Sequence, residues 1–160
     1  MLPRRVTSAS AALVVLAACG TSGTLRIPTA AIPVDPCRVI TPAEARRFSG
    51  GTATQHQDPL TRTCTYIAQK RGAIGFLQVQ AFVGANAYRL HLFAHVRGLA
   101  HVGEKAYVHV DPARPAAQLR FVRRGRTFVL SYSVLDRRHP ASPAAVETKL
   151  VALARRIANR

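Results

Sequence analysis

The feature that most limits the fold of this chain is the alternation of apolar and polar side chains in short segments between residues 63 and 134. The segment 75–83 shows it most clearly, with Leu77 and Val79 on one face and Gln78 and Gln80 on the other. A period of two residues is typical of a β-strand that buries only one face. The sequence therefore predicts a sheet with one face covered by other elements.

Four further segments carry strand signals: 63–69, 105–110, 118–123 and 127–134. Arg71-Gly72 and Arg124-Gly125-Arg126 lie between neighbouring segments and favour tight hairpin turns. These patterns predict an antiparallel sheet of about five strands. The polar residues 50–61 predict an exposed loop before the sheet.

Three segments predict helices packed on this sheet. Thr41-Pro42-Ala43-Glu44 has the form of a capping box with proline at the first helical position, and Ser49-Gly50-Gly51 keeps this helix short. Residues 85–96 predict a middle helix. Ser142-Pro143 begins a long C-terminal helix whose apolar face is Val146, Leu150, Leu153 and Ile157. The expected fold is a single α+β domain over residues 35–160.

The N-terminus has the layout of an export signal. Arg4 and Arg5 precede a short apolar run, Ala11–Ala18, that ends in small side chains. The run is about half of the 20 or so apolar residues that a membrane span needs, and a buried helix here would lack capping residues. Leu16-Ala17-Ala18-Cys19 resembles the lipobox of bacterial lipoproteins.

The lipobox resemblance implies that residues 1–18 are removed as a signal peptide and that the thiol of Cys19 carries a diacylglyceryl group. Cleavage by ordinary signal peptidase is the alternative. Residues 19–34 then form a lipid-bearing tether, because they contain glycines and prolines without periodicity. The expected location is the extracytoplasmic face of the cell membrane, held there by the lipid.

The cysteines fit this location. Once Cys19 is assigned to the lipid, Cys37 and Cys64 remain. Outside the cytoplasm an even remainder of cysteines favours a disulfide, and two buried free thiols are the alternative.

The formal net charge of +16 points to polyanionic partners. An exported protein meets anionic lipid headgroups and wall polymers rather than nucleic acid. The candidate residues for binding an anionic surface are Arg120, Arg123, Arg124, Arg126, Arg137 and Arg138. The alternatives for this basic run are a solvated sheet edge whose charges block strand pairing, and arginine enrichment from the codon bias of a GC-rich genome.

Several short motifs resemble a family of actinobacterial lipoproteins that share a domain of unknown function. The motifs are Asp35-Pro36-Cys37, Ile40–Glu44, Cys64-Thr65-Tyr66, Val102–Ala106 and Leu150–Arg155. Within the fourth, Lys105 stands where the family has an acidic residue. The resemblance implies surface display, a disulfide and a fold similar to PsbP-type α+β sandwiches. It implies no settled activity.

Signals for chemistry are weak. His91 and His95 are spaced for one helix face, and His101 or His109 are near enough in sequence to supply a third zinc ligand. No acidic residue lies between positions 59 and 103, however, to support such ligands. Nucleophile elbows and phosphate-binding loops are absent from the sequence. We therefore expect no metal, no cofactor and no catalytic residue.

The function expected from the sequence is that of a non-enzymatic binding or accessory module, which recognises anionic lipid, a wall polymer or a membrane protein. The alternative is a small lipid- or solute-carrying lipoprotein with an apolar pocket, which needs a large cavity between sheet and helix.

Overall fold

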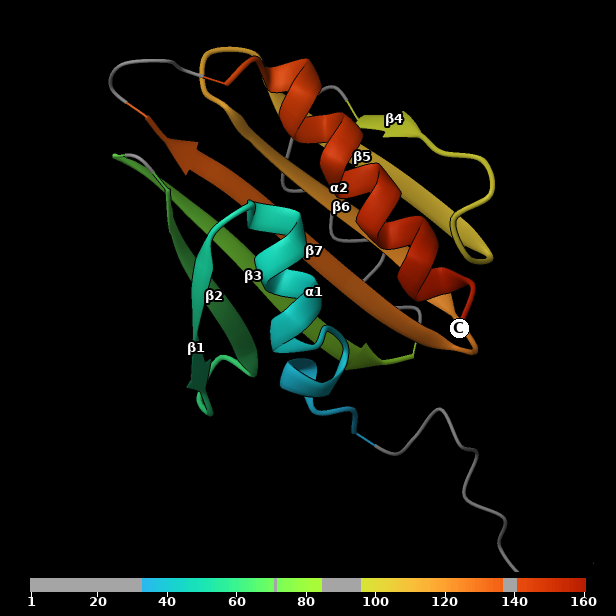
Figure 1. The fold of residues 1–160 in the computed structure, drawn as a ribbon. Helices are drawn as coiled ribbons and strands as arrows, with labels where there is room; N and C mark the ends of the chain where they lie inside the picture. The colour runs from blue at the N-terminus through green and yellow to red at the C-terminus, as the bar shows by residue number, and fades with distance from the viewer. Residues whose placement is uncertain (1–32, 71, 85–95, 137–140) are drawn as a thin grey trace, which may run out of the picture.

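The computed structural model describes residues 33–70, 72–84, 96–136 and 141–160. In this part of the chain, seven strands form one antiparallel sheet in the order β1-β2-β3-β7-β6-β5-β4, and two α-helices lie on one face of it (Figure 1). The strands are β1 Thr52–Asp58, β2 Thr63–Lys70, β3 Ala73–Val83, β4 Val96–Gly98, β5 Lys105–Asp111, β6 Ala116–Arg123 and β7 Arg126–Leu135. The helices are the 3-10 turn η2 Pro36–Arg38, α1 Pro42–Ser49 and α2 Pro143–Ala158.

The prediction of an α+β domain with an antiparallel sheet is confirmed, and the alternating pattern has the expected meaning. In β3, Leu77 and Val79 are buried beneath the helices, whereas Gln78 points to the opposite face of the sheet. Strand β3 pairs with β7 along its length, so that Leu77 lies opposite Tyr132. The face without α1 and α2 is called the open face below.

Both α-helices begin as their sequences predict. The hydroxyl of Thr41 accepts a hydrogen bond from the amide of Glu44 (3.2 Å), and the carboxylate of Glu44 accepts one from the amide of Thr41 (2.9 Å). Ser142 caps α2 through the amide of Ala145 (3.2 Å). The buried face of α2 contains the four predicted residues and Ala154.

The prediction of a loop over residues 50–61 is wrong, because Thr52–Asp58 forms β1, which pairs with β2 at one edge of the sheet. Apart from the partly buried Ala53, its side chains are polar and exposed, so the strand carries no apolar alternation. It is held by backbone hydrogen bonds to β2, which any side chain permits. The short edge strand β4 was also missed, and the predicted five strands become seven.

The predicted middle helix at 85–96 lies largely outside the described residues, and Val96 is the first residue of β4. None of the described helices is long and apolar enough to cross a membrane.

The predicted disulfide between Cys37 and Cys64 is present, with the two Cα atoms 5.1 Å apart. It joins η2 to β2. Two residues further along β2, the Tyr66 hydroxyl donates hydrogen bonds to the carbonyl oxygens of Ile40 (2.5 Å) and Cys37 (3.3 Å). The segment before α1 is therefore fixed to the sheet by a covalent bond and a buried phenol.

Candidate functional site

The described chain begins at one end of the sheet, and exposed arginines gather at the same end. Pro33 and Val34 border a hollow with Pro59 and Arg62 of the β1–β2 turn. Strand register places this turn, the C-terminus of β3 and the β6–β7 turn at that end. The C-terminus of α2 lies there as well, because Arg123 donates a hydrogen bond to the carbonyl oxygen of Ile157 (2.9 Å).

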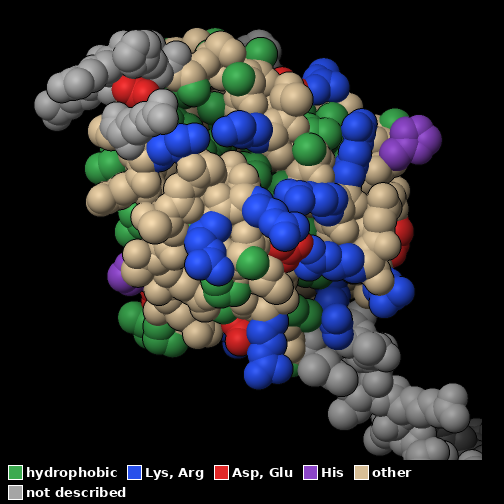
Figure 2. Space-filling model, in the orientation of Figure 1, with side chains coloured by type: hydrophobic (Ala, Val, Ile, Leu, Met, Phe, Trp, Pro, Cys, Tyr) green, Lys and Arg blue, Asp and Glu red, His purple; other side chains and the backbone are tan. Residues whose placement is uncertain are grey.

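We call this region the basic end and define it by Arg38, Arg62, Arg123, Arg124, Arg126, Arg155, Arg156 and Arg160. These arginines outnumber the carboxylates in the same region, which are Asp35, Glu44, Asp58 and Glu104. Figure 2 shows Lys and Arg side chains across the helix side of the molecule and down to the end where the described chain begins.

Three of the arginines predicted to bind an anionic surface belong to the basic end. Arg124 is exposed, whereas Arg123 and Arg126 are partly buried. Burial, and then the charge of Arg124, lower the pKa of Arg123. The carbonyl that Arg123 binds is at the C-terminus of α2, where the helix dipole favours a cation.

Arg120 does not belong to an exposed patch, contrary to the prediction. It is only 5% exposed and lies on the open face. Its Nε atom donates to the side-chain oxygen of Gln118 (3.3 Å), and its guanidinium carbon lies 6.0 Å from the ring centre of Tyr107. Arg120 is therefore part of the packing of β5 and β6. The predicted residues Cys19, Arg137 and Arg138 lie outside the described residues.

Three further arginines of the basic end were not predicted to belong to a binding surface, namely Arg155, Arg156 and Arg160. Arg155 and Arg156 are in the last turn of α2 and are exposed. Arg160 forms an ion pair with Glu44 of α1 and donates to the carbonyl oxygen of Val39 (3.4 Å). The sequence did show arginines in the last turn of the predicted C-terminal helix. However, only the tertiary contact of Arg123 with Ile157 places this helix terminus beside the β6–β7 turn.

A groove of about 420 Å³ lies at the other end of the helix layer, between the C-terminus of α1 and the first half of α2. Small residues of β2 and β3 form its floor, namely Ala68, Ala73 and Gly75. Phe48, Tyr132 and Ala141 are also among its lining residues. Three cations from three different elements line it as well: Arg47, Lys70 and Lys149.

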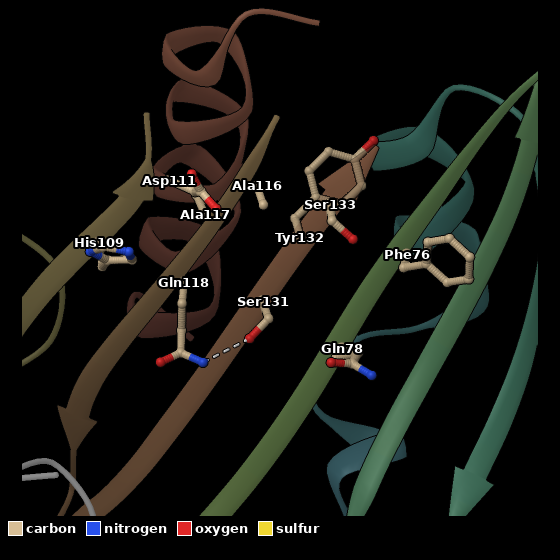
Figure 3. Close-up of a pocket in the computed structure, with 10 residues that line it drawn as sticks. All are labelled: Phe76, Gln78, His109, Asp111, Ala116, Ala117, Gln118, Ser131, Tyr132 and Ser133. Atoms are coloured by element: carbon tan, nitrogen blue, oxygen red, sulfur yellow. Dashed lines mark hydrogen bonds between the residues drawn. The ribbon is translucent and has the colours of Figure 1, made fainter. Parts of the chain in front are cut away.

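A smaller hollow of about 200 Å³ lies on the open face (Figure 3). There the Gln118 amide donates to the hydroxyl of Ser131 (3.1 Å), and Phe76 and Gln78 stand on the neighbouring strand β3. Sites for small molecules usually have volumes of about 300 to 1,000 Å³. By this measure the groove between the helices is the better candidate.

Among the described residues, no three His, Cys, Asp or Glu side chains are grouped to hold a metal ion. His109 is on β5 and His101 is in the preceding loop, whereas His91 and His95 lie outside the described residues.

Comparison with models of protein families, with curated proteins and with solved structures gave no match.

Proposed function

We propose that this protein is an exported lipoprotein whose domain acts as a binding module, docking through its basic end on the anionic headgroups of the membrane that holds its lipid. The observation that carries the proposal is that Pro33, where the tether would join the domain, lies at the same end as the exposed arginines. A lipid on Cys19 would therefore hold this end nearest to the membrane.

The reach of the tether supports this orientation. Cys19 and Pro33 are separated by 33 − 19 = 14 residues. A flexible chain of that length has an average end-to-end distance of about 20 Å. Strand β3 contains 11 residues, and a strand rises about 3.3 Å per residue, so the opposite end of the sheet is about 35 Å away. The basic end is within the average reach of the tether, whereas the opposite end is not.

The energetics also favour docking. A basic side chain close to an anionic leaflet contributes about 1 kcal/mol, but only within a Debye length of about 8 Å at physiological salt. A lipid anchor together with a basic surface gives more stable membrane association than one acyl chain alone. The side chains that count are thus the exposed ones, Arg38, Arg62, Arg124, Arg155, Arg156 and Arg160, although Arg160 is already paired with Glu44.

Flotation of the unacylated chain from residue 20 onward with vesicles tests the docking step. We expect binding to vesicles that contain anionic phospholipid, little binding to neutral vesicles, and loss of binding as the salt concentration rises. Arg124→Gln, Arg155→Gln and Arg156→Gln together should weaken binding by about 100-fold, because each lost charge is worth about 1 kcal/mol.

The matched control also removes three exposed arginines, but away from the basic end: Arg46→Gln, Arg47→Gln and Arg114→Gln. It should bind almost as well as the unmodified chain. Docking by the basic end would be refuted if both triple variants lost the same amount of vesicle binding. It would also be refuted if the unmodified chain bound neutral and anionic vesicles equally. The anchor is tested separately by mass spectrometry of the membrane fraction, in which an unmodified Cys19 would contradict the lipoprotein assignment.

A further inference from the structure

Several of the residues that line the groove between α1 and α2 are small. Near the basic end, Arg160 joins the two helices through Glu44 and Val39. Towards the opposite end the helices are not joined in this way, and Ala68 and Gly75 provide little side-chain volume beneath them. A Cβ atom on Gly75 would lie 3.1 Å from the hydroxyl of Tyr132, so the absent side chain leaves room for that phenol.

The hydroxyl of Tyr132 is a hydrogen-bond donor placed in this groove. Tyr132 is 5% exposed, and Phe48 of α1 packs edge-on against it with ring centres 4.6 Å apart. No hydrogen bond joins its hydroxyl to another described residue. Burial also raises the pKa of Tyr132, which keeps the phenol protonated and able to donate at neutral pH.

The charges at the groove are mostly positive. Arg47, Lys70 and Lys149 come from α1, β2 and α2, and all three are exposed at its rim. A Cβ atom on Gly50 would lie 3.3 Å from the amino group of Lys70, which places that amino group at the C-terminus of α1. Asp136 is the carboxylate that lines the groove, and it has a contact of its own.

These features together indicate the size and the chemistry of a ligand that would fit the groove. The volume of about 420 Å³ suits a small molecule. The inner part of the groove is apolar, with the buried Phe48 and Tyr132 beside the partly buried Val134 and Ala141, and therefore favours an alkyl chain. The cationic rim favours an anion, and the phenol of Tyr132 can donate a hydrogen bond to an acceptor oxygen.

We propose that the groove binds one single-chain amphiphile with an anionic head group, whose oxygen accepts a hydrogen bond from Tyr132 while Lys70 and Lys149 neutralise its charge. The alkyl chain lies along Phe48 and Val134. This inference goes beyond docking and does not depend on it, because the groove is at the opposite end of the helix layer.

Calorimetric titration of the full chain carrying Cys19→Ala, with decanoate as the probe, tests the inference. We expect one molecule bound per chain, at least tenfold more tightly than decanol, which lacks the charge, or acetate, which lacks the chain. Lys70→Gln together with Lys149→Gln should weaken decanoate binding at least tenfold and leave decanol binding unchanged. The control, Arg46→Gln with Arg114→Gln, removes two exposed charges that do not line the groove.

Two further variants separate ligand contacts from folding. Tyr132→Phe removes only the donor, and should weaken decanoate binding severalfold without lowering the urea midpoint. Ala73→Leu adds volume to the groove at a partly exposed position, and should weaken both decanoate and decanol. The absence of saturable decanoate binding would overturn the proposal. So would equal affinity for decanol, or equal effects of the groove and control variants. The Arg124, Arg155 and Arg156 variant should bind decanoate normally, so failure of docking and failure of the groove are distinguishable.

Discussion

The hydroxyl of Tyr66 donates a hydrogen bond of 2.5 Å to the carbonyl oxygen of Ile40, which is 26 residues earlier in the chain. Ile40 is fully buried and directly precedes Thr41, the N-cap of α1. The disulfide to Cys64 is two residues away on the same face of β2. One short piece of β2 therefore fixes the position of the start of α1 on the sheet.

Replacement of Tyr66 by phenylalanine should lower the free energy of unfolding by about 1 to 3 kcal/mol, because it leaves a buried carbonyl without its donor. Urea denaturation at constant m-value measures this change. Tyr132→Phe is the matched control, since its hydroxyl bonds to no other described residue. Equal losses in the two variants would show that the Tyr66 bond adds nothing.

Stability should fall as the pH rises above about 10, the ordinary pKa of tyrosine. Burial, and then the charge of Asp35, raise the pKa of Tyr66, and burial raises the pKa of Tyr132. A raised pKa in the folded state means that the stabilisation is complete below the unfolded pKa and is lost as pH rises through the folded value. Unfolding measured between pH 8 and 12 should show a shallower decline when both tyrosines are replaced by phenylalanine. An unchanged slope would contradict the assignment.

Reduction of the disulfide between Cys37 and Cys64 should lower the free energy of unfolding by about 3 to 4 kcal/mol, given their separation of 27 residues. Denaturation of the Cys37→Ser, Cys64→Ser double variant should give a similar loss. Cys19→Ser serves as the control and should unfold like the unmodified chain. A thiol assay of the purified protein should find Cys37 and Cys64 only after reduction.

Arg120→Ala should be clearly destabilising, by about 1.5 to 3 kcal/mol, because it removes a buried charged donor from Gln118. Lys105→Ala removes an exposed cation from the first residue of β5, at the end of the same pair of strands, and should change stability by less than about 0.5 kcal/mol. Thermal or urea unfolding of both variants decides between packing and surface charge as the role of Arg120.

Arg124→Asn should stabilise the fold by about 0.5 to 1 kcal/mol. Arg124 and Gly125 have φ values of 49° and 67°, and they connect the paired residues Arg123 and Arg126. A two-residue turn with two positive φ values favours Asn-Gly, and a side chain such as Arg is strained there. Arg124→Val should destabilise the fold, because a β-branched residue tolerates this conformation poorly. The order of the three urea midpoints checks the prediction.

The sequence predicted the elements whose side chains divide into a buried and an exposed face. Leu77 and Val79 in β3, and Leu150 and Leu153 in α2, are spaced by the period of their own element, so local pattern and tertiary burial agree. Strand β1 was not predicted, because an edge strand pairs through its backbone and tolerates polar side chains.

The candidate sites were less predictable because they depend on contacts between distant segments. Arg120 occupies a position in β6 that alternation assigns to the exposed face, yet it is buried against Gln118 and Tyr107. The basic end requires the contact of Arg123 with Ile157. The groove depends on the spacing of two helices over Gly75, and no local pattern carries that information.

The strand order has a consequence for how the chain reaches this structure. Strands β1 to β3 and strands β4 to β7 form two meanders of sequence neighbours, and only the pairing of β3 with β7 joins them. Leu77 and Tyr132, which face each other across that junction, are separated by 132 − 77 = 55 residues. Closing such a distant pair is the slow part of folding for a sheet of this kind. Until β3 pairs with β7, each meander has an unpaired strand edge that can bind a strand of another chain. Aggregation therefore competes with folding before these two strands pair.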